Sequence, residues 1–163
     1  RQPCHRHPYA TRGMTGFKQP LSVLVVIHTP ALEVLLLERA AHPGFWQSVT
    51  GSREDDEALL ATARREVAEE TGIDTVRYPP VDWRITNTFE IFSEWRHRYA
   101  PGVTQNTEHV FGLEVPRPLE IKVAPDEHRD WTWMPWREAA ARCFSWSNRD
   151  AILLLPQRLA RGT

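Results

Sequence analysis

The chain has 163 residues, of which 41% are hydrophobic and 25% are charged, and its formal net charge is −1. This balance is typical of one globular domain, and the near-zero charge excludes a global basic field that would attract nucleic acid. No apolar run approaches the roughly 20 residues that span a bilayer, so we expect neither a nucleic-acid partner nor a membrane segment.

The N-terminal residues 1–13 are basic and lack the apolar core of a secretory signal. We expect them to be a disordered extension, followed by a single domain over residues 14–163. Cys4 and Cys143 fit no metal or redox spacing, which predicts two free thiols in a cytoplasmic protein. The oligomeric state is left open, and a monomer is consistent with the sequence.

The first half of the chain predicts a buried hairpin followed by a helix. Residues 21–27 are β-branched and apolar, as in a strand covered on both faces, and Thr29-Pro30-Ala31 separates them from a partner strand at 34–37. A short extended segment at 45–49 ends in Thr50-Gly51. Good helix formers with early acidic residues then predict a helix over 56–71, which Gly72 ends.

The second half predicts further strands and two helices. The expected strands, in chain order, are Trp83 to Phe92, Arg96 to Tyr99, His109 to Val115, and Trp131 to Met134. The expected helices run from Pro135 to Arg142 and from Asn148 to Leu159, the second interrupted near Pro156. The predicted fold class is α/β (α+β), with a mixed β-sheet between α-helices.

A row of glutamates on the first predicted helix indicates a metal site. At 3.6 residues per turn, the apolar stripe that packs on the sheet is formed by Leu60, Ala63 and Val67. Glu66 and Glu70 lie on one face beside this stripe, with Glu69 one step around. Two half-buried carboxylates repel each other and lose solvation, and a hard cation such as Mg²⁺ relieves both penalties. Its bound water would then supply the nucleophile for hydrolysis.

The segment from Gly51 to Ile73 resembles the Nudix box, G-x5-E-x7-R-E-U-x-E-E-x-G-U, where U is aliphatic. The matching residues are Gly51, Glu57, Arg65, Glu66, Val67, Glu69, Glu70, Gly72 and Ile73. The resemblance implies the Nudix fold, in which the box forms a loop-helix-loop, and Mg²⁺-dependent cleavage of a phosphoanhydride, with Mn²⁺ as a substitute.

The same resemblance implies a role for each box position. Glu57 and Arg65 pair to orient the helix, while Gly51 and Gly72 are loop and cap residues with unusual backbone angles. The metal ligands are Glu66 and Glu70, joined by the loop residue Glu127, which is also the candidate general base. Glu69 completes the catalytic set.

Several segments outside the box resemble the bacterial branch of the family that converts 7,8-dihydroneopterin triphosphate to the monophosphate and pyrophosphate in folate synthesis. They are Phe45 to Ser52, Phe89 to Ser93, Arg96 to Thr104, Asn106 to Glu108, and Ser145 to Arg149. The resemblance places phosphate contacts at Lys18 and Arg39. It places further substrate contacts at Thr50, Phe89, Glu90, Ile91, Phe92 and Ser145, with the aromatic rings on a flat pterin and a carboxylate at its amino-pyrimidine edge.

Alternatives stay open at this stage. Lys18 and Arg39 fit ordinary surface cations, Phe89 and Phe92 fit strand core, and Glu127 fits a solvated loop acid. The substrate could be a nucleoside triphosphate such as dATP, in nucleotide housekeeping, or the domain could be a silent ligand sensor. The histidines, His128 among them, form no metal-ligand spacing, so they are assigned no metal.

Overall fold

The computed structural model describes residues 16–161. The predicted extension at residues 1–13, the domain boundary at residue 14 and Cys4 lie outside this range. The strands are β1 (Leu21–His28), β2 (Glu33–Arg39), β3 (Trp46–Gln47), β4 (Val49–Ser52), β5 (Val81–Glu90), β6 (Gln105–Glu114) and β7 (His128–Pro135). The helices are α1 (Leu59–Thr71), the 3₁₀ helix η1 (Ser93–Arg98), α2 (Trp136–Arg142), α3 (Trp146–Leu153) and α4 (Leu155–Ala160).

The seven strands form one mixed sheet around β1. This strand pairs in parallel with β6 along its whole length and antiparallel with β4 over four residues. β2 pairs antiparallel with β7 and β3, and β5 pairs antiparallel with β6. The predicted hairpin of β1 and β2 is therefore reduced to a single register pair, His28 with Val34, because β4 and β6 occupy the edges of β1.

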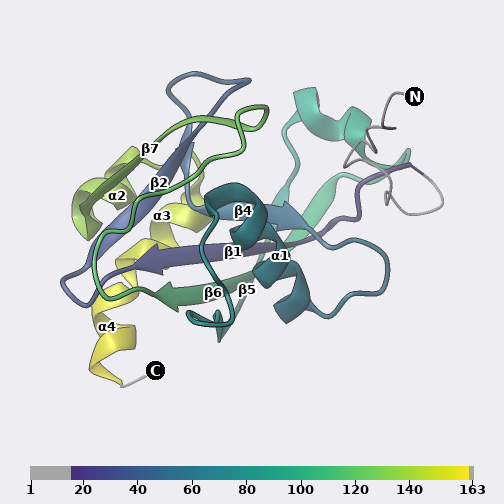
Figure 1. Cartoon of the computed structure of the whole chain (residues 1–163). Coiled ribbons are helices and arrows are strands. Elements are labelled where there is room, and N and C mark those ends of the chain that lie inside the picture. The colour runs from purple at the N-terminus through teal and green to yellow at the C-terminus, as the bar shows by residue number, and fades with distance from the viewer. Residues whose placement is uncertain (1–15, 162–163) are drawn as a thin grey trace, which may run out of the picture.

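Helices cover both faces of this sheet, as the sequence predicts (Figure 1). Alternate residues of β1 enter two separate apolar clusters. Val23 and Val25 pack with Ala63 and Val67 of α1 on one face. Leu24 and Val26 pack on the opposite face with residues of α2, α3 and α4. β1 is thus buried on both faces, which explains its continuous apolar sequence.

The α1 helix differs from the prediction at its start. It begins at Leu59 rather than at residue 56, so the acidic residues Asp56 and Glu57 precede it and its first turn has no acid. Leu60, predicted to face the sheet, is 40% exposed, whereas Leu59 packs against the apolar cluster with Ala63. Leu59 and Ala63 are four residues apart and share the face of α1 that packs on the sheet, and Leu60 falls beside that face.

Residues 96–99 form part of η1 and its end, and the predicted strand there is wrong. Only Tyr99 keeps extended pairing, as an isolated parallel bridge to Lys18. The final helix is interrupted as expected, with α3 ending at Leu153 and α4 starting at Leu155, just before Pro156. Among residues 16–161, no helix has both the length and the apolar character needed to cross a membrane.

Candidate active site

Glu66 and Glu70 project from α1 toward the sheet and are removed from solvent. The side chain of Glu66 is 12% exposed, and Glu70 is 2% exposed. Burial raises the pKa of Glu66 to about 7, with the charge of Glu69 as a further cause. Burial also raises the pKa of Glu70 well above its usual range, with the nearby charges of Glu66 and Glu127 adding to it. The expected half-buried carboxylate row is therefore present.

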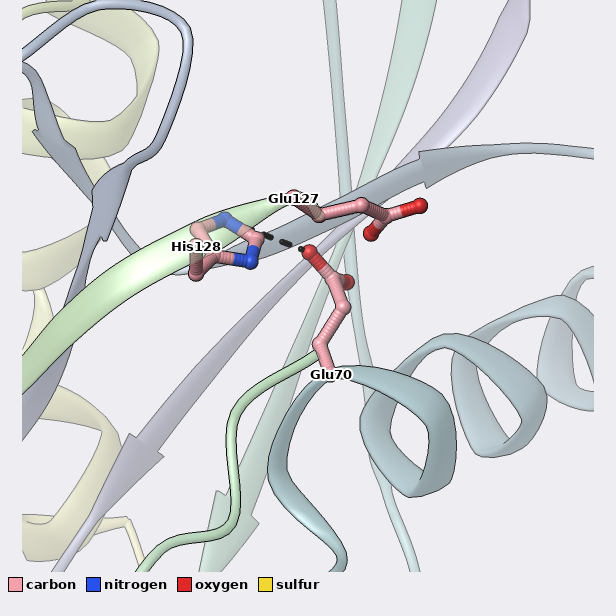
Figure 2. Close-up of side chains that lie close together, drawn as sticks. All are labelled: Glu70, Glu127 and His128. Carbon is pink, nitrogen blue, oxygen red and sulfur yellow. Dashed lines mark ion pairs between the residues drawn. The ribbon is translucent and has the colours of Figure 1, made fainter. Parts of the chain in front are cut away.

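His128 is the first residue of β7 and Glu127 immediately precedes it; both side chains approach Glu70, which projects from α1 (Figure 2). One potential ligand atom from each of the three residues lies within 4.8 Å of the others. The Glu70 carboxylate lies between the other two groups, with its Oε1 atom 3.6 Å from His128 Nε2. Sequence spacing alone gave His128 no metal role, but β7 brings this histidine into a group that could hold an ion, beside a helix that is distant in sequence.

His128 is a neutral imidazole at neutral pH. Its burial, together with the positive charge of Arg39, lowers its pKa to about 4. Gln47 Nε2 lies 3.4 Å from His128 Nε2, next to Glu70. The close approach of His128 to Glu70 is therefore a contact with a neutral ring and not an ion pair.

These residues fit a divalent cation. Glu70 Oε2 is buried and has no hydrogen-bond partner among the described residues. Two ligands on opposite sides of Mg²⁺, each at about 2.1 Å, are about 4.2 Å apart, so a cluster within 4.8 Å closes on an ion with small side-chain adjustments. The raised pKa values of Glu66 and Glu70 show that the metal-free site disfavours their ionised forms, and a bound cation would stabilise those forms.

Gly51 has a different role from the one predicted. It lies within β4 and is not among the glycines with positive φ, so it is not a loop residue with unusual backbone angles. A Cβ at this position would overlap the carboxyl group of Glu66. A glycine is therefore required at position 51 because the Glu66 carboxyl group occupies the space that a larger side chain would fill. Gly72 does behave as predicted, since it ends α1 with φ 72°.

Arg65 ties the loop before α1 to the helix. Its Nη2 atom donates to Glu57 Oε1 at 2.6 Å and to the Ser52 carbonyl at 3.1 Å, while its Nε atom donates to Glu57 Oε2. Its Nη1 atom also reaches Glu66 at 2.9 Å and Glu69 at 3.4 Å. The Glu69 side chain is 56% exposed and outside the metal cluster. The Glu57–Arg65 pair thus holds the loop-helix junction together.

Three basic residues lie near the carboxylates. Burial lowers the pKa of Lys18, and the nearby charge of Arg98 lowers it further, while Glu66 and Glu127 oppose the shift. Arg39 shows the same pattern, with its pKa lowered by burial and by Arg98. Arg39 Nε is buried without a hydrogen-bond partner among the described residues. Cations that are held together at a desolvation cost are suited to bind a polyanion.

An aromatic cluster adjoins Arg39. It consists of His42, Phe45, Phe92, Trp95 and Phe144. Its rings are 5.0 to 6.5 Å apart between centroids, and the Arg39 guanidinium lies 4.8 Å from the Trp95 ring centroid. Phe92 is 50% exposed within it. Flat apolar surface is therefore available next to the basic residues.

The remaining predicted substrate residues are not all free to bind a ligand. The Thr50 hydroxyl donates to the Val23 carbonyl, and the Ser145 hydroxyl accepts from Asn148 N at the start of α3. Ile91 is 4% exposed and donates its backbone N–H to the Thr104 carbonyl.

The other two candidates lie on opposite sides of β5. The Glu90 side chain is 77% exposed and reaches Arg96 at 4.0 Å. Phe89 is half-buried and meets Trp146 edge to face.

Sequence reasoning considered Arg98, with Arg96 and His97, for phosphate binding but assigned it no role, and it missed most of the aromatic cluster. It included Glu108 in a segment that resembles the family but assigned it no role; Glu108 is 5% exposed, and burial raises its pKa to about 7. Its burial had no local signal, because the residues from Gln105 to His109 are all polar. The aromatic cluster unites residues 42 to 144 and has no local sequence signature.

Comparisons with known proteins agree with this geometry. The family described as NUDIX domain matches residues 18–155. The chain is 48% identical over 139 residues to the dihydroneopterin triphosphate diphosphatase of Escherichia coli (strain K12), covering 83% of this chain and 91% of that protein. It is 39% identical over 142 residues to the Haemophilus influenzae protein of the same name, covering 85% of this chain and 89% of the relative.

Solved structures give the same result. The structure of the Escherichia coli dihydroneopterin triphosphate pyrophosphohydrolase matches with a TM-score of 0.79 and 48% identity, covering 83% of this chain and 94% of that one. A putative NUDIX hydrolase from Listeria monocytogenes matches with a TM-score of 0.75 and 25% identity, covering 88% of this chain and 97% of that one. The fold, the box and the family match agree, and the chain belongs to the NUDIX domain family.

Proposed function

We propose that this chain hydrolyses 7,8-dihydroneopterin triphosphate to dihydroneopterin monophosphate and pyrophosphate, in a reaction that needs Mg²⁺ and serves folate synthesis. The observation that carries this proposal is the 48% identity, over 83% of the chain, to an enzyme named for that substrate. The buried Glu70 beside Glu127 and His128 supports the metal requirement. Mn²⁺ suits the same oxygen and nitrogen ligands.

Glu66, Glu70 and Glu127 are the proposed metal ligands, and His128 is the neutral group beside them. A bound divalent cation would polarise the phosphates and lower the pKa of a bound water. Glu127 is exposed and has a raised pKa, owing to partial burial and the charge of Asp126, so it is suited to accept a proton from the attacking water. Arg65 keeps Glu66 in place through a 2.9 Å hydrogen bond.

Lys18, Arg39 and Arg98 are the proposed phosphate-binding residues. Burial, and after it the charge of Arg98, lowers the pKa values of Lys18 and Arg39, and the negative charges of a triphosphate would offset the repulsion among these cations. Arg39 adjoins both the carboxylates and the aromatic cluster, which would place the phosphate chain between the metal ligands and the rings. The pterin would then lie on the aromatic side of the site.

The decisive measurement is pyrophosphate release from 7,8-dihydroneopterin triphosphate with Mg²⁺, with Mn²⁺ and with EDTA, beside dATP. We expect metal-dependent release with a higher kcat/KM for the pterin. A dATP value equal to or above the pterin value would overturn the substrate assignment and leave the enzyme class intact. Absence of release from both compounds would favour a silent sensor domain.

Glu66→Gln separates catalysis from folding. The variant should keep its fold while losing most turnover, because the change removes a charge without changing side-chain size. Arg64→Gln, at an exposed neighbouring position on the same helix, is the matched control and should leave kcat unchanged. Wild-type turnover in Glu66→Gln would refute the proposed metal site.

A cytoplasmic location and a monomeric state are further parts of this proposal. The absence of a membrane-crossing helix among residues 16–161 is compatible with the first. Fractionation of the producing cells and light scattering of the purified protein would test the two points separately.

A further inference from the structure

A buried polar patch lies on the face of the sheet that α3 covers, away from the metal cluster. We define this polar patch as Ser22 of β1, Asn106 and Glu108 of β6, and Ser147 and Asn148 of α3, each 5% exposed or less. Ser22 and Glu108 are register partners across the parallel β1–β6 pair. Asn106, two residues from Glu108 on the same face, donates from Nδ2 to the Ser22 hydroxyl at 2.8 Å.

Two acceptors of the polar patch lack donors. Glu108 Oε1 and Asn106 Oδ1 are shielded from solvent and have no hydrogen-bond partner among residues 16–161. The Ser147 hydroxyl donates to Glu108, and no cation of the described chain forms an ion pair with it. Leaving a buried acceptor unpaired is costly, so two such acceptors, two residues apart on one face of β6, indicate a site that a ligand completes.

The polar patch adjoins the aromatic residues at the active-site end of the sheet. Asn106 is the register partner of Phe89, whose ring centroid lies 6.4 Å from that of Trp146 in an edge-to-face arrangement. Trp146 immediately precedes Ser147 and is 46% exposed. Trp146 therefore presents an exposed aromatic ring directly beside a residue of the polar patch, where a flat ligand ring could pack.

The ligand edge that fits two neighbouring acceptors carries two neighbouring donors. The 2-amino-4-oxopyrimidine edge of a pterin presents a ring N–H beside an amino group, and guanine presents the same edge. Adenine presents one donor beside one acceptor, which would leave an acceptor of the polar patch facing an acceptor. Glu90 does not compete for this role, because its side chain is 77% exposed.

We infer that Glu108 and Asn106 bind the amino-pyrimidine edge of the substrate and make the site selective for pterin and guanine rings over adenine. This inference rests on one part of the proposed function, namely that the substrate is a triphosphate that carries a heterocyclic ring. Asn148 acts as a positioning residue for α3, since its side chain accepts from Ser48 N at 2.8 Å and donates to the Ser48 hydroxyl at 2.9 Å.

The test measures equilibrium binding of 7,8-dihydroneopterin triphosphate, dGTP and dATP in EDTA, where no hydrolysis occurs. In the wild type, we expect the pterin and dGTP to bind more tightly than dATP. Glu108→Gln keeps one acceptor and should lower the pterin-to-dATP affinity ratio about tenfold, whereas Glu108→Met removes both acceptors and should lower it about a hundredfold. The ratio does not depend on the fraction of folded protein in a preparation.

Glu114→Gln and Glu114→Met are the matched controls. They make the same changes on the same strand, about 20 Å further along β6, at an exposed position. Both should leave the ratio unchanged. A wild type that binds dATP as tightly as the pterin, or a ratio that stays within about twofold in Glu108→Met, would overturn the inference. Because binding is read without turnover, selective binding by an inactive protein would refute the proposed function alone.

Discussion

The carboxyl group of Glu66 fills the space beside Gly51 in β4. The position of this proposed metal ligand therefore depends on the absence of a side chain at residue 51. Gly51→Ala should displace the Glu66 carboxylate while leaving the backbone of β4 unstrained, because Gly51 has no positive φ. We expect kcat to fall about a hundredfold, the effect of a displacement of about 1 Å at a catalytic group. Steady-state kinetics together with urea unfolding would show lost activity with little lost stability.

Gly112→Ala provides the opposite control. A Cβ at Gly112 would overlap the Trp83 ring, which belongs to the apolar cluster under α2, α3 and α4 and not to the metal cluster. This variant should lose stability by about 1–3 kcal/mol through overpacking while its folded fraction keeps its kcat. If both alanine variants were equally active, Glu66 would not need its present position.

Glu108 predicts how stability changes with pH. Burial raises its pKa from 4.5 to about 7, so the folded state holds this proton more tightly than the unfolded chain. Ionisation of Glu108 therefore lowers the free energy of unfolding as pH rises from about 4.5 to about 7, and the loss is complete above pH 7. Urea unfolding in EDTA should find Glu108→Gln about 3 kcal/mol more stable than the wild type at pH 8 and nearly equal to it at pH 4.5. A constant difference across this range would contradict the raised pKa.

Single residues were predictable from the sequence where their roles depend on local spacing. Glu66 and Glu70 share a helical face because they are four residues apart, and the structure places both in a buried row. The reason for Gly51 was not predictable, because its constraint comes from a side chain fifteen positions away in a different element. His128 became relevant only through the position of β7 next to α1.

At the scale of elements, the loop-to-α1 junction depends on Arg65. Arg65→Lys removes the forked contact with Glu57, so we expect a loss of about 2 kcal/mol in the free energy of unfolding, the value typical of hydrogen bonds to charged groups. A smaller loss of kcat should accompany it, because Arg65 also holds Glu66. Chemical denaturation at pH 7 checks the first point.

Arg64→Lys is the control for Arg65→Lys. Arg64 is exposed on the outer face of α1, so the same substitution there should change stability by less than about 0.5 kcal/mol. Equal destabilisation by the two changes would mean that helix propensity, and not the pairing with Glu57, is responsible.

The positions of helices and strands were predictable where a segment is continuously apolar and buried. They were less predictable where one side-chain contact sets the end of an element. β1 and β2 follow from unbroken apolar runs. The start of α1 did not follow, because Glu57 accepts the Glu54 backbone N–H and the Thr62 hydroxyl from outside the helix. The segment 96–99 has the composition of a strand, but 3₁₀ geometry places Trp95 between Arg39 and Arg98.

For the whole molecule, metal binding and stability should be linked. Ionised Glu70 is costly in the metal-free fold, and Mg²⁺ would bind that ionised form, so Mg²⁺ should raise Tm. At a hundred times its Kd, the added free energy of unfolding is about 2.7 kcal/mol. Glu70→Gln should abolish this Mg²⁺-dependent rise in differential scanning calorimetry. Glu33→Gln, distant from the cluster on β2, should preserve it. A rise of equal size in Glu70→Gln would place the ion elsewhere.

The overall architecture could be predicted as a class but not as a pairing scheme. Alternating strands and helices with one glutamate-rich helix indicate a mixed sheet between helices, and the structure confirms this arrangement. The pairing of β1 with β6 has no local signature, because the two strands are joined by more than seventy residues of other elements. The polar patch could not be predicted for the same reason, since Ser22 and Glu108 become neighbours only through that pairing.

The parallel pairing of β1 with β6 also has a consequence for biosynthesis. Leu21 has as its partner Thr107, which leaves the ribosome 86 residues later. At about 5–20 residues per second, the apolar β1 strand waits roughly 4–17 s without its main partner. Throughout that interval, the nascent chain exposes an aggregation-prone apolar segment that a chaperone can recognise. Slower translation of the codons between residue 28 and β6 should therefore increase aggregation in the cell, even though the amino-acid sequence of the finished protein is unchanged.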